Sequence, residues 1–174
     1  MKTLEIRRHS TRTKPGEHLS QAGVTLARQV GEGMGPFDGV LTSTLPRAFE
    51  TAIAMGFAVD VQDKLLNPYG GAVEKEVPWP ATFPDYAAAV DRGNATWKFA
   101  RRLLKFFSEL AEDLEDDRVA LLVSHGGVVE IGAVACLPDA DHASWGAGLG
   151  LCEGVRLFWD NGKFEKAEIL RISK

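Results

Sequence analysis

The stretch L-E-I-R-R-H-S-T-R, residues 4–12, sets the pattern around which the rest of the chain is organised. Leu4 and Ile6 alternate with charged residues, which predicts a short β-strand that ends at Arg8 and His9. The carboxyl ends of strands carry the ligand sites of α/β folds. An imidazole beside a guanidinium at such an end suits attack on a phosphorus atom whose oxygens are negatively charged. The same pair also fits a solvated strand exit without function, so the argument depends on what recurs downstream.

Two further strands run into basic residues in the same way. Residues 39–42 predict a short strand, and Arg47 follows in the first turn of a helix, where unpaired backbone N–H groups and the helix dipole attract an anion. The apolar run 119–123 predicts a strand buried on both faces, which ends at His125 before two glycines that permit a tight bend. Alone, Arg47 also fits an exposed helix arginine, and His125 a structural histidine. Three strand ends that share one pattern favour a common site.

The remaining segments add helices and an edge hairpin. Apolar residues at helical spacing predict helices that begin near residues 20, 46, 96 and 128, and a strand is predicted at residues 59–61. The Asn161-Gly162 pair predicts a β-hairpin over residues 154–172. We therefore expect an α/β fold, a three-layer α/β/α sandwich with a mostly parallel central sheet and an antiparallel edge hairpin.

Residues 58–84 form an irregular excursion rich in proline and glycine. Such a loop in a compact domain is typical of a lid or binding loop. Its aromatic residues Trp79 and Phe83, and Tyr86 just beyond, either line a substrate mouth or fasten the loop to the core.

Length and composition bound the class of protein. The 174 residues fit a single domain, residues 1–174, and 20 Lys+Arg against 24 Asp+Glu give no general attraction to nucleic acid or to an anionic membrane. Cys136 and Cys152 lack C-x-x-C spacing, which indicates free thiols in a reducing compartment. The first residues resemble neither a signal peptide nor a membrane span, so we expect a soluble cytoplasmic protein. The oligomeric state is left open.

The basic residues at the three strand ends define an anion pocket. Because parallel strands point their carboxyl ends to one side of a sheet, Arg8, His9, Arg47 and His125 are expected to meet. Two planar guanidiniums suit the oxygens of a phosphate group. Two histidines with arginine neighbours and no carboxylate in the same motifs are a poor metal site, so we expect neither a metal nor another cofactor.

Four motifs in the expected order resemble the histidine phosphatase superfamily, in its phosphoglycerate-mutase-like branch. The family motif R-H-G-x-T is similar to residues 8–12, and L-(S/T)-x-x-G is similar to residues 19–23. The motif S-x-L-x-R-A-x-x-T-A matches residues 43–52, and V-S-H-G-G matches residues 123–127. The resemblance also implies a phosphoglycerate-mutase-like fold.

The resemblance assigns a role to each basic residue. It implies a phosphohistidine intermediate on His9, a phosphate held by Arg8, Arg47 and His125, and no metal. One departure concerns Ser10, which stands where the family motif has glycine. Serine is small enough to fit there, but a backbone that needs positive φ would be strained.

A second departure concerns the general acid. The family supplies it from a segment like L-x-E-x-x-x-G, and the similar segment here, residues 65–71, contains no carboxylate. Glu74 is the first candidate substitute, with Glu76 and Asp63 as alternatives, and the absence of any acid also stays open. An alkoxide leaving group needs a positioned acid more than the imidazole of phosphohistidine does.

The function that these residues predict is metal-independent phosphatase activity, in which His9 attacks phosphomonoesters or phosphohistidine. The expected partner is a small phosphorylated substrate or a phosphohistidine protein, with no nucleic acid and no membrane. The alternative is a phosphate-binding module without turnover, which Ser10 and the missing acid favour. A mutase is a further alternative, although such an enzyme needs a closed site that excludes water.

Overall fold

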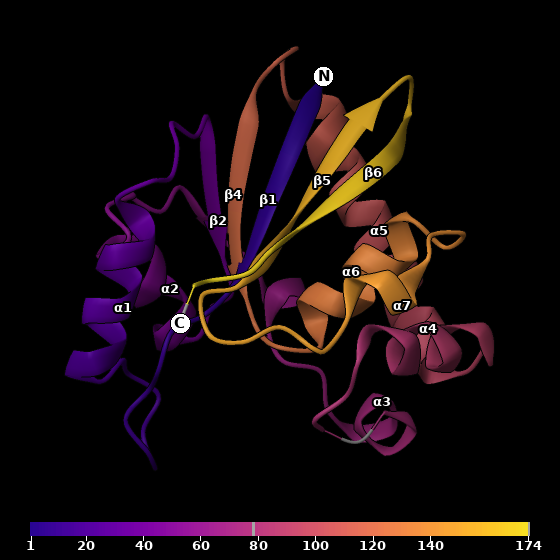
Figure 1. Ribbon diagram of the computed structural model, residues 1–174, viewed down its shortest axis with the longest axis horizontal. Coiled ribbons are helices and arrows are strands. Elements are labelled where there is room, and N and C mark those ends of the chain that lie inside the picture. The colour runs from indigo at the N-terminus through magenta and orange to yellow at the C-terminus, as the bar shows by residue number, and fades with distance from the viewer. Residues whose placement is uncertain (78, 174) are drawn as a thin grey trace.

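The computed structural model describes residues 1–77 and 79–173, which form one mixed sheet between two layers of helices (Figure 1). The strands are β1 (Lys2–Arg8), β2 (Gly39–Thr42), β3 (Val61–Gln62), β4 (Val119–Ser124), β5 (Gly154–Asp160) and β6 (Lys163–Leu170). The helices are α1 (Gln21–Gly31), α2 (Pro46–Ala54), α3 (Gly71–Glu76), α4 (Phe83–Asp91), α5 (Ala95–Asp113), α6 (Val128–Cys136) and α7 (His142–Trp145), with a 3-10 turn at Lys64–Leu66.

The strand order is β3-β2-β4-β1-β5-β6. Strands β3, β2, β4 and β1 are parallel, whereas β5 is antiparallel to β1 and to β6. The expected mostly parallel sheet with an antiparallel edge hairpin is therefore confirmed. Strand β4 inserts between β1 and β2 although it follows them by many residues, and this insertion places the ends of β1 and β4 side by side.

Alternate residues of β4 face the two helical layers. Leu121 and Val123 pack with Ala48 and Ala52 of α2, while Leu122 lies in the larger core beneath α4, α5 and α6. Figure 1 shows α1 and α2 on one side of the strands and the other helices opposite. This arrangement confirms the three-layer α/β/α sandwich, because a strand buried on both faces needs apolar cover on each.

The segment between β3 and α5 contains more regular structure than the sequence indicated. Helix α4 begins with a capping box in which the Thr82 hydroxyl accepts from the Asp85 N–H and the Asp85 carboxylate accepts from the Thr82 N–H. Phe83 and Tyr86 of this helix are fully buried, so they fasten the segment to the core. Trp79 instead stays half-exposed.

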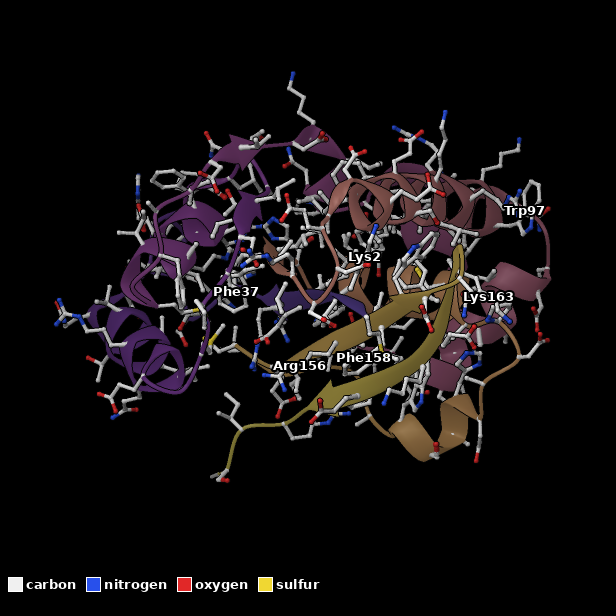
Figure 2. The ribbon with its side chains drawn as sticks, turned by 90° about the horizontal axis from the view of Figure 1, so that it is seen from above. Lys2, Phe37, Trp97, Arg156, Phe158 and Lys163 are labelled. Atoms are coloured by element: carbon white, nitrogen blue, oxygen red, sulfur yellow. The ribbon has the colours of Figure 1, made fainter. Side chains whose placement is uncertain are left out.

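The β5–β6 hairpin turns at Asn161 and Gly162, whose φ values of 49° and 77° fit the tight turn that this residue pair favours. Figure 2 shows Lys163 at the end of this hairpin, and Trp97 on the outer side of α5. In the part of the chain that the structure describes, no helix has the length and apolar character needed to cross a membrane.

Candidate active site

The two histidines meet because β1 and β4 are neighbours. Arg8 pairs in register with Ser124, so His9 and His125 are the next residues on adjacent strands. The His9 N–H donates to the Ser124 carbonyl at 2.9 Å, which extends the pairing by one residue. The two imidazole rings lie with centroids 5.0 Å apart. Residues that are 116 positions apart in the chain thus lie side by side at the ends of two neighbouring strands.

His9 is oriented with one ring nitrogen fixed and the other available. Its Nδ1 lies 2.6 Å from the Ser10 carbonyl oxygen, which can only accept, so Nδ1 carries the proton and Nε2 is unprotonated. The Arg47 Nε donates to this Nε2 at 3.3 Å. Burial, followed by the charges of Arg47 and Arg8, lowers the pKa of His9 to about 4. The ring is therefore a neutral nucleophile near pH 7.

Arg47 reaches His9 from the first turn of α2. Pro46 occupies the first helical position, where the absence of an N–H has no cost. The Arg47 side chain is buried against His9, and its Nη1 contacts the half-exposed carboxylate of Glu17. The guanidinium thus links the nucleophile to the solvent-facing side of the site.

His125 is oriented by Ser43. The Ser43 Oγ accepts from the Leu45 N–H at 3.2 Å and lies 2.6 Å from His125 Nε2. Burial, followed by the neighbouring His9, Arg47 and Arg8, lowers the pKa of His125 to about 2, so this ring is also neutral. The Ser43 hydroxyl then donates to Nε2, which leaves the proton on Nδ1. That Nδ1 is buried and has no partner.

Arg8 is the fourth basic residue of the site. Its Nη1 donates to the Leu149 carbonyl at 2.7 Å, and its guanidinium lies 5.0 Å from the centre of the Trp79 ring. Its Nε is buried without a partner. Among residues 1–77 and 79–173, the buried side-chain nitrogens and oxygens without a hydrogen bond are this Nε and Nδ1 of His125. Buried donors rarely go unsatisfied, so this pair marks a place for an acceptor.

Small residues let the backbone fit closely around the site. A Cβ atom on Gly126 would lie 2.4 Å from the Trp79 ring and 3.1 Å from Arg8 Nε. Ser10 does not have the positive φ that would strain it: its N–H donates to Thr51 Oγ1 at 2.9 Å, and its hydroxyl donates to the Gly23 carbonyl at 2.7 Å. Serine therefore fits where the family motif has glycine, and it ties β1 to α1 and α2.

A cavity of about 310 Å³ opens over His9. Its lining is strongly cationic: Arg8, His9, Thr11, Arg12, Lys14, Arg47, Trp79 and Leu151. The sequence motifs predict no role for Arg12 or Lys14. Arg12 is a further cation three residues after His9 in the sequence, but only the folded loop places it in the lining of the cavity.

The candidate acids of the sequence analysis do not line this cavity. Glu74 lies on the exposed side of α3. Glu76 accepts from the N–H groups of Ala95 and Thr96 at 2.9 and 2.8 Å, so it caps the first turn of α5. Asp63 accepts from the Leu65 N–H at 2.7 Å and caps the 3-10 turn. The structure thus brings together Arg8, His9, Arg47 and His125, but none of the three carboxylates.

Buried Glu130 of α6 also holds the pocket in shape. One carboxylate oxygen accepts from the Gly127 N–H at 2.6 Å and the other from the Leu149 N–H at 2.8 Å. Leu149 is the residue whose carbonyl receives Arg8. Burial raises the pKa of Glu130, against the effect of these hydrogen bonds. No group of three or more His, Cys, Asp or Glu side chains that could hold a metal occurs among the residues described.

Comparison with known families identifies the class of this chain. Residues 5–170 match the histidine phosphatase superfamily (branch 1), so the chain belongs to this superfamily. A comparison with curated protein sequences finds no significant match.

Solved structures share the fold over almost the whole chain. Phosphoserine phosphatase from Entamoeba histolytica, in complex with 3-phosphoglyceric acid, has a TM-score of 0.74 at 16% identity and covers 99% of this chain and 98% of its own. A mycobacterial glucosyl-3-phosphoglycerate phosphatase in complex with VO3 has a TM-score of 0.67 at 22% identity and covers 98% and 99%. At these identities the likeness establishes the fold, which is that of phosphoglycerate-mutase-like proteins.

Proposed function

We propose that this protein is a metal-independent phosphatase that hydrolyses phosphomonoesters or phosphohistidine through a phosphohistidine intermediate on His9. The observation that carries the proposal is the pair of unsatisfied buried donors, Arg8 Nε and His125 Nδ1, near the unprotonated Nε2 of His9. A phosphate group supplies the acceptor oxygens that both donors lack.

The proposed reaction follows from the orientation of these groups. Nε2 of His9 attacks phosphorus in line, a bond from Nε2 to phosphorus forms, and the bond to the leaving group breaks. Arg8, Arg47 and neutral His125 donate hydrogen bonds to the remaining phosphate oxygens, where charge accumulates. Water then attacks the phosphorus, the electron pair of the N–P bond returns to His9, and inorganic phosphate leaves.

The relatives lend support from outside the chain. The two described above are named as phosphatases, one with a phosphorylated acid and the other with an oxyanion of vanadium. Both kinds of ligand fit a pocket lined by four positively charged side chains and a neutral imidazole. The cationic lining favours a small, strongly anionic substrate.

Trapping the intermediate tests the proposal. Protein incubated with a ³²P-labelled substrate and quenched in alkaline detergent is expected to carry label that survives base and is lost in acid, as phosphohistidine is. His9→Ala is expected to carry none. His142→Ala is the matched control, because His142 lies on α7 and bonds the Leu137 carbonyl outside the cavity. Equal labelling of His9→Ala and wild type would overturn the proposal.

Turnover of p-nitrophenyl phosphate separates an enzyme from a binding module. Its leaving group needs little protonation, so a phosphatase is expected to hydrolyse it with or without EDTA. Tight binding of inorganic phosphate without any turnover would instead favour the binding module. Transfer of label from the enzyme to a second alcohol rather than to water would indicate a mutase.

A further inference from the structure

The cavity over His9 is lined by basic side chains but by no acidic one, although release of an alcohol needs a proton donor. Its lining includes Arg8, Arg12, Lys14 and Arg47, and no carboxylate. Within the described residues, the only ion pairs to these arginines come from Glu17, which contacts Arg47 Nη1 and lies 3.8 Å from Arg12. Among the described residues, Glu17 is thus the acidic side chain that pairs with the arginines of this lining.

A small hairpin after β1 holds Glu17 in place. The Thr13 N–H donates to the His18 carbonyl at 2.9 Å, and Arg12 and Leu19 form an isolated bridge. The Leu19 N–H donates to Glu50 of α2 at 2.7 Å, which fastens the base of the hairpin. The hairpin therefore positions the backbone around Glu17, whereas its side chain is 52% exposed and is held by Arg47.

Glu17 is connected to His9 through Arg47, whose Nε donates to His9 Nε2 and whose Nη1 contacts the Glu17 carboxylate. His9 is 8% exposed in the lining of the cavity, whereas the Glu17 side chain, 52% exposed, lies on the more solvent-exposed side of Arg47. In-line attack by the buried imidazole directs the leaving group towards the more exposed side of the cavity. The leaving oxygen therefore emerges on the side where Glu17 lies.

Phosphate binding also changes what Glu17 can do. Glu17 occupies the Arg47 nitrogen that a phosphate oxygen needs, so a bound phosphate displaces the carboxylate from Arg47. The displaced group then faces the phosphate without Arg47, and Arg12, which lies 3.8 Å from Glu17 in this structure, is its remaining cationic partner. Phosphate binding therefore releases the Glu17 carboxyl group from Arg47 and makes it available to the leaving oxygen.

We propose that Glu17 is the general acid of this enzyme, and that the substrates therefore include alkyl phosphate esters. This inference rests on the phosphatase activity proposed above. As the bond from Nε2 of His9 to phosphorus forms and the ester bond breaks, the Glu17 proton passes to the leaving oxygen, and a neutral alcohol departs. Water then gives a proton to the Glu17 carboxylate as its oxygen attacks phosphorus, and the N–P electron pair returns to His9. The net reaction converts ester and water into alcohol and phosphate.

The other acidic residues near the site are engaged elsewhere. Both carboxylate oxygens of Glu130 accept backbone N–H groups, and Glu76 caps α5. Glu74 is exposed on α3. The inference therefore assigns to Glu17 the role that the sequence analysis gave first to Glu74.

The dependence of kcat/KM on the leaving group tests the role of Glu17. A series of aryl and alkyl phosphates is compared for wild type, Glu17→Gln, Glu74→Gln and the control Glu32→Gln, which changes an exposed glutamate at the end of α1. The ratio kcat/KM reports the step in which the ester bond breaks, so it is not affected by slow hydrolysis of phosphohistidine. Glu17→Gln is expected to lose about a hundredfold or more on alkyl esters and at most a few fold on p-nitrophenyl phosphate.

The outcomes are distinguishable. Equal losses on both substrate types, no loss, or a selective loss in Glu74→Gln would overturn the role of Glu17 while leaving the phosphatase intact. Wild-type turnover of aryl phosphates but not of alkyl phosphates would do the same. Absence of turnover and of labelled His9 in wild type would overturn the phosphatase proposal itself, and this inference with it.

Discussion

Acidification is expected to destabilise the folded protein through His9 and His125. Both rings are buried, and burial lowers their pKa values from 6.5 to about 4 and about 2, respectively. The unfolded chain therefore binds protons in a range where the folded state does not. Stability from this source is fully present above about pH 6.5 and is lost as the pH falls below that value.

The size of the effect follows from the two pKa values. Between about pH 7.5 and about pH 5, each histidine is expected to remove about 2 kcal/mol from the free energy of unfolding, or about 4 kcal/mol together. That loss is a large share of the stability of a typical domain, which is about 5–15 kcal/mol.

Urea unfolding followed by tryptophan fluorescence measures this loss. The wild type is compared with His125→Asn and with His9→Asn at both pH values, because asparagine keeps a polar group but does not titrate. Each variant is expected to lose about 2 kcal/mol less than the wild type on acidification. Subtracting the change in the free energy of unfolding of the variant from that of the wild type cancels the contribution of the carboxylates, because they are present in both proteins.

Saturating phosphate provides an independent check. A bound dianion favours the protonated rings, so phosphate is expected to raise both pKa values and to reduce the acid sensitivity. If His125→Asn and the wild type lose the same stability on acidification, the description of His125 as a buried neutral ring is wrong.

Three substitutions are expected to change the reaction in different ways. Ser43→Ala removes the hydroxyl that donates to His125 Nε2, so about a tenfold loss of kcat/KM is expected. The tautomer of His125 is expected to change, which the ¹⁵N chemical shifts of its ring report. Unchanged shifts would contradict the hydrogen bond from Ser43. Arg47→Lys keeps the charge but loses the planar fork and the Nε contact to His9, so kcat is expected to fall about a hundredfold, and a loss below about fivefold would argue against the contact. Trp79→Ala uncovers Arg8, and the inhibition constant of phosphate is expected to rise about two- to fivefold, whereas Trp79→Phe retains most of the affinity.

Much of the fold was predictable because its determinants are local. The alternation in β1, the apolar run of β4 and the Asn161-Gly162 turn each reflect the side-chain period or the φ preference of a few adjacent residues. Helix α4 is not predicted from the sequence, although Thr82 and Asp85 have the spacing of a capping box, because the prolines before and within its first turn favour a loop. Its position was set by the burial of Phe83 and Tyr86 in the core.

The roles of the carboxylates were not predictable in the same way. Glu74, Glu76 and Asp63 are close in sequence to the expected acid segment, but contacts with distant backbone decide what each one does. Glu76 caps α5 through residues almost twenty positions away, and Glu17 meets Arg47 across 30 positions. Such contacts depend on how whole elements pack, which no short pattern encodes.

The sequence by itself determined which basic residues follow strands, since hydrophobic periodicity ends two strands beside Arg8, His9 and His125 and a third one shortly before the helix that carries Arg47. Only the tertiary structure decided that β4 inserts beside β1, that His125 keeps its proton on a buried nitrogen beside His9, and that an acidic side chain pairs with Arg47. The physical reason is that strand ends follow from local preferences, whereas strand order and side-chain partners follow from the burial of two sheet faces at once.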